Sequence, residues 1–118
     1  MKTAYYHLED NRLAVIDLID TSELIVDGSV NPPNMYIVSR VNTPKCLRGR
    51  GLAKKLMTEM TSDADEAQAL LVLDLQPYPG TDRRRLLRLY HQFGFELKAD
   101  GSMMRTPRAT NEYLLPAQ

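Results

Sequence analysis

The sequence predicts an α+β fold: a single domain over residues 1–118, with one mixed sheet and two main helices. A chain of this length suits one domain with its own core. In the middle of the chain, two runs of strand-forming residues flank a helical stretch, which is typical of a βαβ unit. Nearer the N-terminus, two β-rich runs joined by a polar turn predict a hairpin.

Composition argues against several classes of function. Charged residues make up 25% of the chain and the formal net charge is zero, so no overall field attracts it to nucleic acid or to a membrane. No apolar run approaches the length of a membrane span, and no basic-then-apolar leader is present. The single cysteine, Cys46, excludes an internal disulfide framework. These features predict a soluble, cytoplasmic protein.

The first element expected is a β-hairpin over residues 3–20. Its first arm ends near Leu8, its second runs from Leu13 to Ile19, and the polar residues 9–12 between them are typical of a turn. The second arm is apolar at most positions, so we expect it to be largely buried on both faces.

Residues 21–34 are less regular. Leu24, Ile25 and Val26 suit a short strand, whereas the Asp-Gly pair at 27–28 and the two prolines at 32–33 favour turns. We expect this segment to be either a short third strand or a flexible insertion.

A βαβ unit with a right-handed crossover should follow. Its strands are expected over Met35–Val41 and over the nearly continuous apolar run Leu70–Leu75, which suits a parallel strand covered on both faces. Its helix is expected over residues 50–67, because apolar residues recur there at spacings of three and four. We expect the helix to bury Leu52, Leu56 and Met60 and to expose Lys54, Lys55, Glu59 and Asp63.

The last third predicts a helix and a strand pair. Thr81 is a plausible N-cap, and the helix should present Leu86, Leu89, Tyr90 and Phe93 on one apolar face. A strand should begin within residues 94–97, a turn at 100–101 should follow, and residues 102–106 should complete an antiparallel pair. Residues 107–118 are expected to form a tail.

The turn before the first helix is the chemically informative place. A helix start offers backbone N–H groups without partners and partial positive charge. Gly49 and Gly51 let a ligand approach the backbone, and Arg48 and Arg50 offer forked donors suited to phosphate. The turn therefore predicts a cradle for a phosphate or pyrophosphate group.

Two common phosphate-binding patterns do not fit this turn. A P-loop needs Lys-Ser or Lys-Thr directly after its last glycine, where this chain has Leu52 and Ala53. A dinucleotide-binding turn needs a third glycine, where this chain has Lys54. The pattern Arg/Gln-x-x-Gly-x-Gly/Ala fits residues 48–53 at every fixed position. It resembles the acyl-CoA pyrophosphate loop of the GNAT superfamily of N-acetyltransferases.

A second motif strengthens the resemblance. Tyr90, Gly94 and Phe95 look like the superfamily's Tyr-x-x-x-Gly-Phe signature, and the resemblance covers residues 35–104. It implies a twisted mixed sheet in which two parallel strands splay apart in a V. The N-terminal half is shortened, because the two helices that the superfamily commonly places there have no room before Met35. Small phage-borne acetyltransferases, including some anti-CRISPR proteins, share this shortened form.

The resemblance also implies the site. Acetyl-CoA would be the co-substrate and no metal would be needed. Tyr90 would be the catalytic general acid that protonates the departing thiolate; the less favoured alternative is that it is only a core position of an amphipathic helix. The residues that would hold the cofactor are Val38, Ser39, Arg40 and Val41 for the pantetheine arm, and Arg48, Gly49, Arg50, Gly51, Leu52 and Ala53 for the phosphates.

The function implied is direct acetyl transfer, in a ternary complex, to an amine of a protein or small molecule. A backbone N–H of the central strand would stabilise the oxyanion. The base is left open among Asp17, Glu23, Asp74 and a water chain, because residues 35–43 contain no acid. Cys46 is better explained as a chance cysteine than as a nucleophile, and His91 as a surface or packing residue.

Two other functions remain as hypotheses. A non-catalytic CoA-binding domain that acts through protein contact would explain the missing base and the reduced wall of the acceptor site. A nucleic-acid-binding module could use the arginines at 83–85 and 88, but zero net charge gives it no broad basic surface. The partners expected are acetyl-CoA and an amine acceptor, with no membrane and no nucleic acid. The reduced N-terminal half makes a homodimer plausible.

Overall fold

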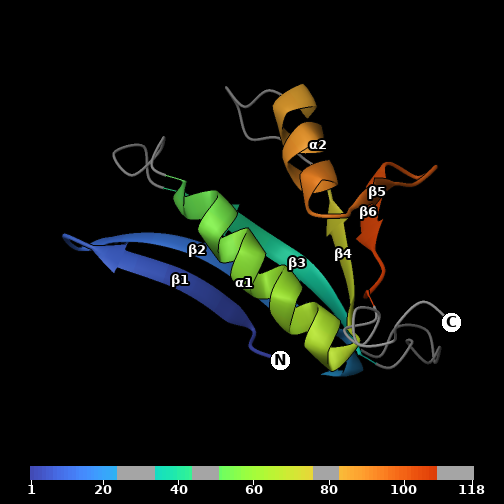
Figure 1. Cartoon of the computed structure of the whole chain (residues 1–118), viewed down its shortest axis with the longest axis horizontal. Helices are drawn as coiled ribbons and strands as arrows, with labels where there is room; N and C mark the ends of the chain where they lie inside the picture. Colours follow the sequence, from blue (N-terminus) through green and yellow to red (C-terminus); the bar gives the residue numbers. More distant parts are fainter. Residues whose placement is uncertain (24–33, 44–50, 76–82, 109–118) are drawn as a thin grey trace, which may run out of the picture.

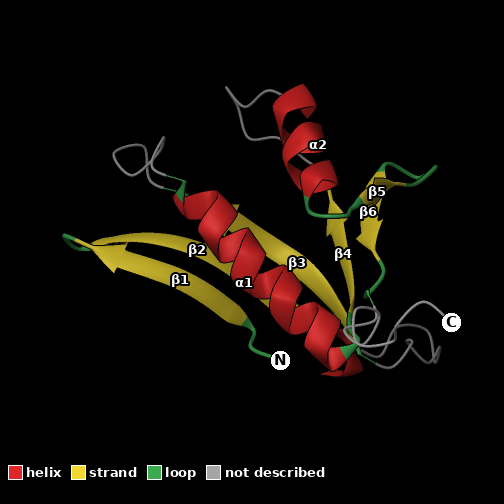
Figure 2. Ribbon diagram, in the orientation of Figure 1, coloured by secondary structure: helices red, strands yellow, loops and turns green. Residues whose placement is uncertain are grey.

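The protein is described here by a computed structural model that covers residues 1–23, 34–43, 51–75 and 83–108. Its centre is a six-stranded mixed sheet with the strand order β1-β2-β3-β4-β6-β5 (Figure 1). Apolar side chains of both helices and of one sheet face join in a single buried cluster. The α+β class with two main helices is therefore confirmed (Figure 2).

The N-terminal hairpin forms as predicted. Strands β1 (Ala4–Glu9) and β2 (Arg12–Asp20) pair antiparallel, and Glu9 lies opposite Arg12. The two residues between them, Asp10 and Asn11, have φ values of 49° and 62°. Two successive left-handed residues suit a tight hairpin turn, and Asp and Asn tolerate that conformation.

Burial of β2 on both faces holds only for the middle of the strand. Ala14, Val15 and Ile16 are all buried, whereas Leu13 and Ile19 near the ends are 40% and 39% exposed. The end residues lie on the face opposite Ala14 and Ile16, because side chains alternate along a strand. The sheet therefore has one fully packed face and one that is only partly covered by the described residues.

A short 3₁₀ helix, η1 (Thr21–Glu23), follows β2. The buried Thr21 hydroxyl donates a hydrogen bond to the carbonyl oxygen of Met35 at 2.9 Å, which ties the end of β2 to the start of β3. The predictions for residues 24–33, for Cys46, for the N-cap Thr81 and for the tail beyond residue 108 lie outside the described residues.

The βαβ unit is present. Strands β3 (Met35–Asn42) and β4 (Leu70–Asp74) are parallel neighbours, and helix α1 (Leu52–Ala67) lies between them in sequence. The helix begins at Leu52, later than predicted, because Gly51 is its N-cap and has a left-handed φ of 74°. It buries Leu52, Leu56 and Met60 as expected.

One prediction for the solvated face of α1 is wrong. Lys54, Lys55 and Glu59 are exposed, but Asp63 accepts a 2.7 Å hydrogen bond from the Tyr5 hydroxyl. The prediction fails because β1 runs alongside this part of the helix, as Figure 1 shows. Burial, followed by the hydrogen bond to the Asp63 carboxylate, raises the pKa of Tyr5 above its ordinary value.

The C-terminal part contains helix α2 (Arg83–Gln92) and strands β5 (Glu96–Leu97) and β6 (Ser102–Arg105). Strand β6 pairs antiparallel with both β4 and β5, so the predicted antiparallel pair at the end of the sheet is confirmed. Its turn contains Gly101, which has a φ of 90°. Within the described ranges, neither helix is long and apolar enough to cross a membrane.

Candidate active site

The two parallel strands separate partway along their length. Strands β3 and β4 are paired from Met35 opposite Leu70 to Val38 opposite Leu73. Beyond that point β3 continues to Asn42, where it is still paired with β2. Figure 1 shows the result, with β3 and β4 diverging from their common start. The V-shaped splay expected from the resemblance is therefore present.

The splay has a local cause in a β-bulge. Asp17 lies opposite Arg40 and Leu18 lies opposite Val38, so Ser39 is an extra residue on β3. The Ser39 hydroxyl donates a 3.1 Å hydrogen bond to the Asp17 carbonyl oxygen, which holds the bulge in place. A bulge bends its strand and increases the twist. Here it immediately follows the last residue of β3 that pairs with β4.

The four residues predicted to hold an extended ligand lie at this splay. Val38 is the last residue of β3 paired with β4, and Ser39, Arg40 and Val41 follow on the diverging segment. Among the described strands, none pairs with this segment on the side facing β4. Its backbone can therefore accept an added strand-like partner through main-chain hydrogen bonds.

The start of α1 provides the second part of the site. Gly51 is the N-cap of α1 and Leu52 and Ala53 are its first two residues, whereas Arg48, Gly49 and Arg50 lie outside the described residues. No side chain of the described residues caps the first turn, and that turn contains no acidic residue. A Cβ built on Gly51 would have no atom within 4 Å. A helix start that the described side chains leave uncapped suits an anion.

Tyr90 lies in the last turn of α2. The residue is only 6% exposed, and its ring meets the Phe95 ring edge-on, with centroids 5.8 Å apart. The ring belongs to the same buried cluster as Val38 and Leu73, the residues at which the splay begins. Tyr90 is therefore a core residue of α2, as the apolar spacing of this helix predicted.

A buried arginine anchors the chain just after Tyr90. Arg105 of β6 donates through Nε to the Phe93 carbonyl oxygen at 2.6 Å and through its two terminal nitrogens to Asp65. Burial alone would raise the pKa of Asp65, but the hydrogen bonds from Arg105 and the Arg108 N–H outweigh it and lower that pKa. Sequence reasoning missed this pair. One signal in the sequence could have found it. Arg105 comes two residues after the apolar Met103, so in an alternating strand it lies on the same buried face, where an arginine needs a partner.

The candidate bases differ in their surroundings. The Asp17 carboxylate accepts a 2.7 Å hydrogen bond from the Nε of Arg40, so it already has a cationic partner. Asp74 is exposed and is the last residue of β4, on the other side of the splay. The side chain of Glu23 lies outside the described part of the structure. No group of three or more side chains that could hold a metal ion occurs among the described residues.

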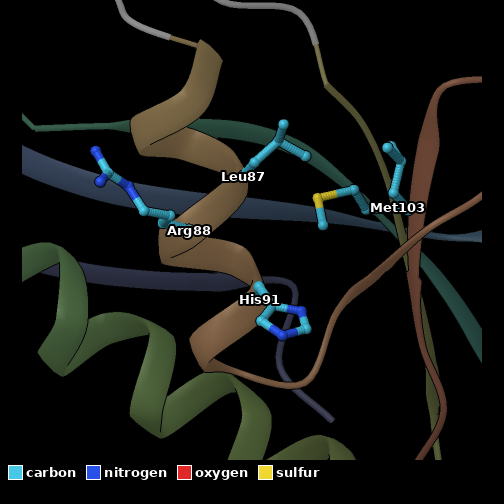
Figure 3. A pocket seen from close by; sticks show the side chains of 5 residues that line it. Leu87, Arg88, His91 and Met103 are labelled. Carbon is cyan, nitrogen blue, oxygen red and sulfur yellow. The ribbon is translucent and has the colours of Figure 1, made fainter.

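An apolar cleft lies between α2 and the pair of strands β5 and β6. It measures about 240 Å³ and is lined by Leu87, Arg88, His91, Leu97 and Met103. Figure 3 shows Leu87 and His91 on α2 with the Met103 side chain reaching toward them from β6. His91 is therefore a surface residue at the rim of a cleft, and none of the lining residues is among those predicted to bind the cofactor.

No family model matches the chain, and no curated protein matches it in sequence. The solved structures that share its architecture include two that are informative about its fold. The crystal structure of the anti-CRISPR protein AcrVA5 matches with a TM-score of 0.57 and 12% identity, over 89% of this chain and 100% of that one. A protein from Bacteroides thetaiotaomicron, assigned to the GNAT family of acetyltransferases, matches with a TM-score of 0.52 and 13% identity, over 97% of this chain and 68% of that one. The chain has a GNAT-like fold. At 12–13% identity, this likeness establishes the GNAT-like fold alone.

Proposed function

We propose that this GNAT-like protein is an acyl-CoA-dependent N-acetyltransferase, which moves acetyl from acetyl-CoA to an amine of a protein or small molecule. The observation that carries the proposal is the splay, because β3 continues for four residues beyond its last pair with β4, from Ser39 to Asn42. A pantetheine arm contains amide groups and can occupy this place as an added strand.

The described residues fit such a ligand at both ends of the site. The segment Val38–Val41 offers backbone donors and acceptors, and the start of α1 at Gly51–Ala53, which no described side chain caps, suits pyrophosphate. We assign Arg48, Gly49 and Arg50 to the same cradle on the strength of the motif. Acetyl-CoA would supply the activated acetyl group, and the protein would bind and orient it.

The chemistry follows from the groups at the splay. The amine nitrogen attacks the thioester carbonyl carbon, and a backbone N–H on β3 near the bulge stabilises the resulting oxyanion. The carbon–sulfur bond then breaks, and the Tyr90 hydroxyl donates its proton to the thiolate. The base that takes the amine proton stays open among Asp17, Glu23, Asp74 and a water chain; of these, the Asp17 carboxylate is paired with Arg40. We place the reaction in the cytoplasm, where acetyl-CoA is available.

One observation favours the alternative, a CoA-binding domain without turnover that acts through protein contact. Tyr90 is 6% exposed and its ring packs on Phe95. A buried tyrosine can protonate the thiolate only if its hydroxyl lies at the wall of the acetyl-CoA site; otherwise it serves only the core. The Tyr90→Phe variant separates the two functions, because a pure binding module would keep its biological effect without this hydroxyl.

The proposal is tested by calorimetric titration of acetyl-CoA into the wild type, Gly51→Asn and Gly51→Asp. Asn and Asp have nearly the same shape and both tolerate the left-handed conformation of residue 51, so the two variants differ mainly in charge. We expect binding to the wild type, weaker binding to the Asn variant and at least about tenfold weaker binding again to the Asp variant, through repulsion of pyrophosphate. A folded wild type that does not bind acetyl-CoA would overturn the proposal.

A further inference from the structure

The two edges of the sheet are unequal. Strand β5 at one edge has two residues, Glu96–Leu97, and the Glu96 carboxylate lies 3.8 Å from Lys98 Nζ, so this edge is short and charged. Strand β1 at the other edge has six residues, with no formal charge from Ala4 to Leu8. Among the described strands, none pairs with the outer side of β1 (Figure 1). Natural sheets usually protect such an edge.

The hairpin register shows which backbone groups of β1 point outward. In an antiparallel pair, alternate residues exchange hydrogen bonds with the partner strand. Glu9 and Arg12 flank the two-residue turn and form such a pair, and the Thr3 carbonyl accepts a bond from the Leu18 N–H at 2.8 Å. The odd-numbered residues therefore bond to β2. The N–H and C=O groups of the even-numbered residues, Ala4, Tyr6 and Leu8, point to the outside.

The same three residues carry the exposed side chains of the edge. The Tyr5 hydroxyl donates a hydrogen bond to Asp63 of α1, so Tyr5 faces the helix. Side chains alternate along a strand, and Tyr6 and Leu8 therefore point to the face away from the helix. They are 65% and 63% exposed, and Leu13, which lies opposite Leu8, is 40% exposed. The free edge and an apolar strip of the hairpin therefore coincide.

We propose that β1 pairs antiparallel with β1 of a second copy of this chain, about a two-fold axis at Tyr6. In this register Tyr6 lies opposite Tyr6 of the second copy, and Ala4 lies opposite Leu8. All the outward-pointing residues of both strands then form hydrogen-bonded pairs. The two sheets become one continuous sheet, and the exposed side chains of the two strips meet across the axis as cross-strand pairs.

The three outward-pointing residues of β1 select this register. With the axis at Tyr6 they pair only with one another, and the segment from Ala4 to Leu8 carries no formal charge, so no like charges are opposed. An axis at His7 would instead place Ala4 opposite Asp10, a turn residue outside β1. A strand whose outward hydrogen-bonding groups are complementary to themselves suits a symmetric dimer.

The first test is sedimentation equilibrium over a range of protein concentrations, without any CoA ligand. We expect the wild type to be a dimer. Tyr6→Pro removes an outward N–H and leaves the β1–β2 bonds intact, so it should weaken association by about tenfold or more. Tyr6→Val keeps the N–H and should weaken association less. A monomeric wild type, or a Tyr6→Pro variant that dimerises as well as the wild type, would overturn the proposal.

The register is tested by disulfide trapping in a Cys46→Ser background. Tyr6→Cys should cross-link to itself, because opposed residues of a bonded pair have Cα atoms about 5.5 Å apart, within disulfide range. Leu8→Cys is the matched control, since its two copies would be about 13 Å apart and should not cross-link. An equimolar mixture of Ala4→Cys and Leu8→Cys should form the mixed disulfide. Cross-linking of Leu8→Cys alone, or none for Tyr6→Cys, would overturn the register. Neither test uses CoA, so the result is independent of the proposed activity.

Discussion

Arg105 of β6 holds Asp65 of α1 in a two-pronged ion pair, with Nη1 at 2.9 Å from Oδ1 and Nη2 at 3.0 Å from Oδ2. The third guanidinium nitrogen, Nε, donates to the Phe93 carbonyl oxygen. The guanidinium thus joins the last turns of α1, the end of α2 and the last strand of the sheet. Because the Arg105 side chain is 4% exposed, it depends on these partners for the hydrogen bonds that water would otherwise provide.

Removing one partner of this pair should destabilise the fold. Asp65→Ala leaves a buried guanidinium without its counter-charge, so we expect the free energy of unfolding to fall by about 3 kcal/mol. Glu66→Ala, at the exposed neighbouring position, should change it by less than about 0.5 kcal/mol. Urea unfolding of the two variants and the wild type measures both values. Equal stability of the two variants would show that the pair contributes nothing.

The same pair should make stability depend on acid. The folded-state pKa of Asp65 is lower than its unfolded value of about 3.9, so its contribution is present above that pH and is lost as pH falls through the folded pKa. The wild type should therefore lose more stability on acidification than Asp65→Asn, which cannot titrate there. Asp20 and Asp100 also have lowered pKa values, but they occur in both proteins and cancel in the comparison. The urea concentration at the unfolding midpoint, measured for both proteins between about pH 6 and about pH 2.5, tests the difference. Parallel pH profiles would contradict it.

The space next to Arg105 can be tested with two glycines, of which Gly94 lies beside the arginine and Gly101 serves as the control. Gly94 and Gly101 have φ values of 92° and 90°, so alanine should strain the backbone at both positions by about 1 kcal/mol or more. A Cβ on Gly94 would also lie 3.3 Å from Arg105 Nε and 3.2 Å from Arg108 Nη2, whereas one on Gly101 would have no atom within 4 Å. Gly94→Ala should therefore be the less stable variant in thermal unfolding. The opposite order would mean that the arginines move aside at no cost.

Two tyrosines should separate stability from turnover. Tyr90→Phe keeps the ring on Phe95, so stability should fall little while acetyl transfer falls by about a hundredfold, because the proton donor is lost. Tyr5→Phe loses the hydrogen bond to Asp63, so stability should fall by about 1 kcal/mol while transfer by the folded protein is kept. Thiol release from acetyl-CoA with a panel of amines, together with urea unfolding, measures both. If Tyr90→Phe transferred acetyl as fast as the wild type, the Tyr90 hydroxyl would not be the proton donor.

The sequence predicted the order of elements because its signals are local. The Asp-Asn turn of the hairpin, the spacing of apolar residues in α1 and the glycine at position 51 each act within a few residues. The start of α1 was misplaced by two residues, because Gly51 is left-handed and the first helical residue must follow it. From the sequence alone, a helix that starts at residue 50 and a helix that starts at Leu52 with Gly51 as its N-cap are both possible.

The missed contacts join residues that are distant in sequence. Asp63 was predicted to face solvent, but its partner Tyr5 is 58 residues away, and Asp65 and Arg105 are 40 residues apart. The bulge at Ser39 likewise depends on the register with Asp17 on another strand. No local pattern encodes such pairs. The assignment of cofactor binding to residues from Val38 to Val41 stays a prediction, and it comes from the resemblance to a family rather than from a local pattern.

The bulge at Ser39 has a consequence for how this chain could have diverged. If a ligand completes the sheet beside residues 39–42, its partners are main-chain atoms, and those atoms are the same whichever amino acid occupies the position. Selection would then act on the bend of β3 and on the glycine at the start of α1, and would leave most side chains of the strand free to change. Low identity to structural neighbours that share the fold, 12–13% here, would then be expected even where such a binding surface is kept.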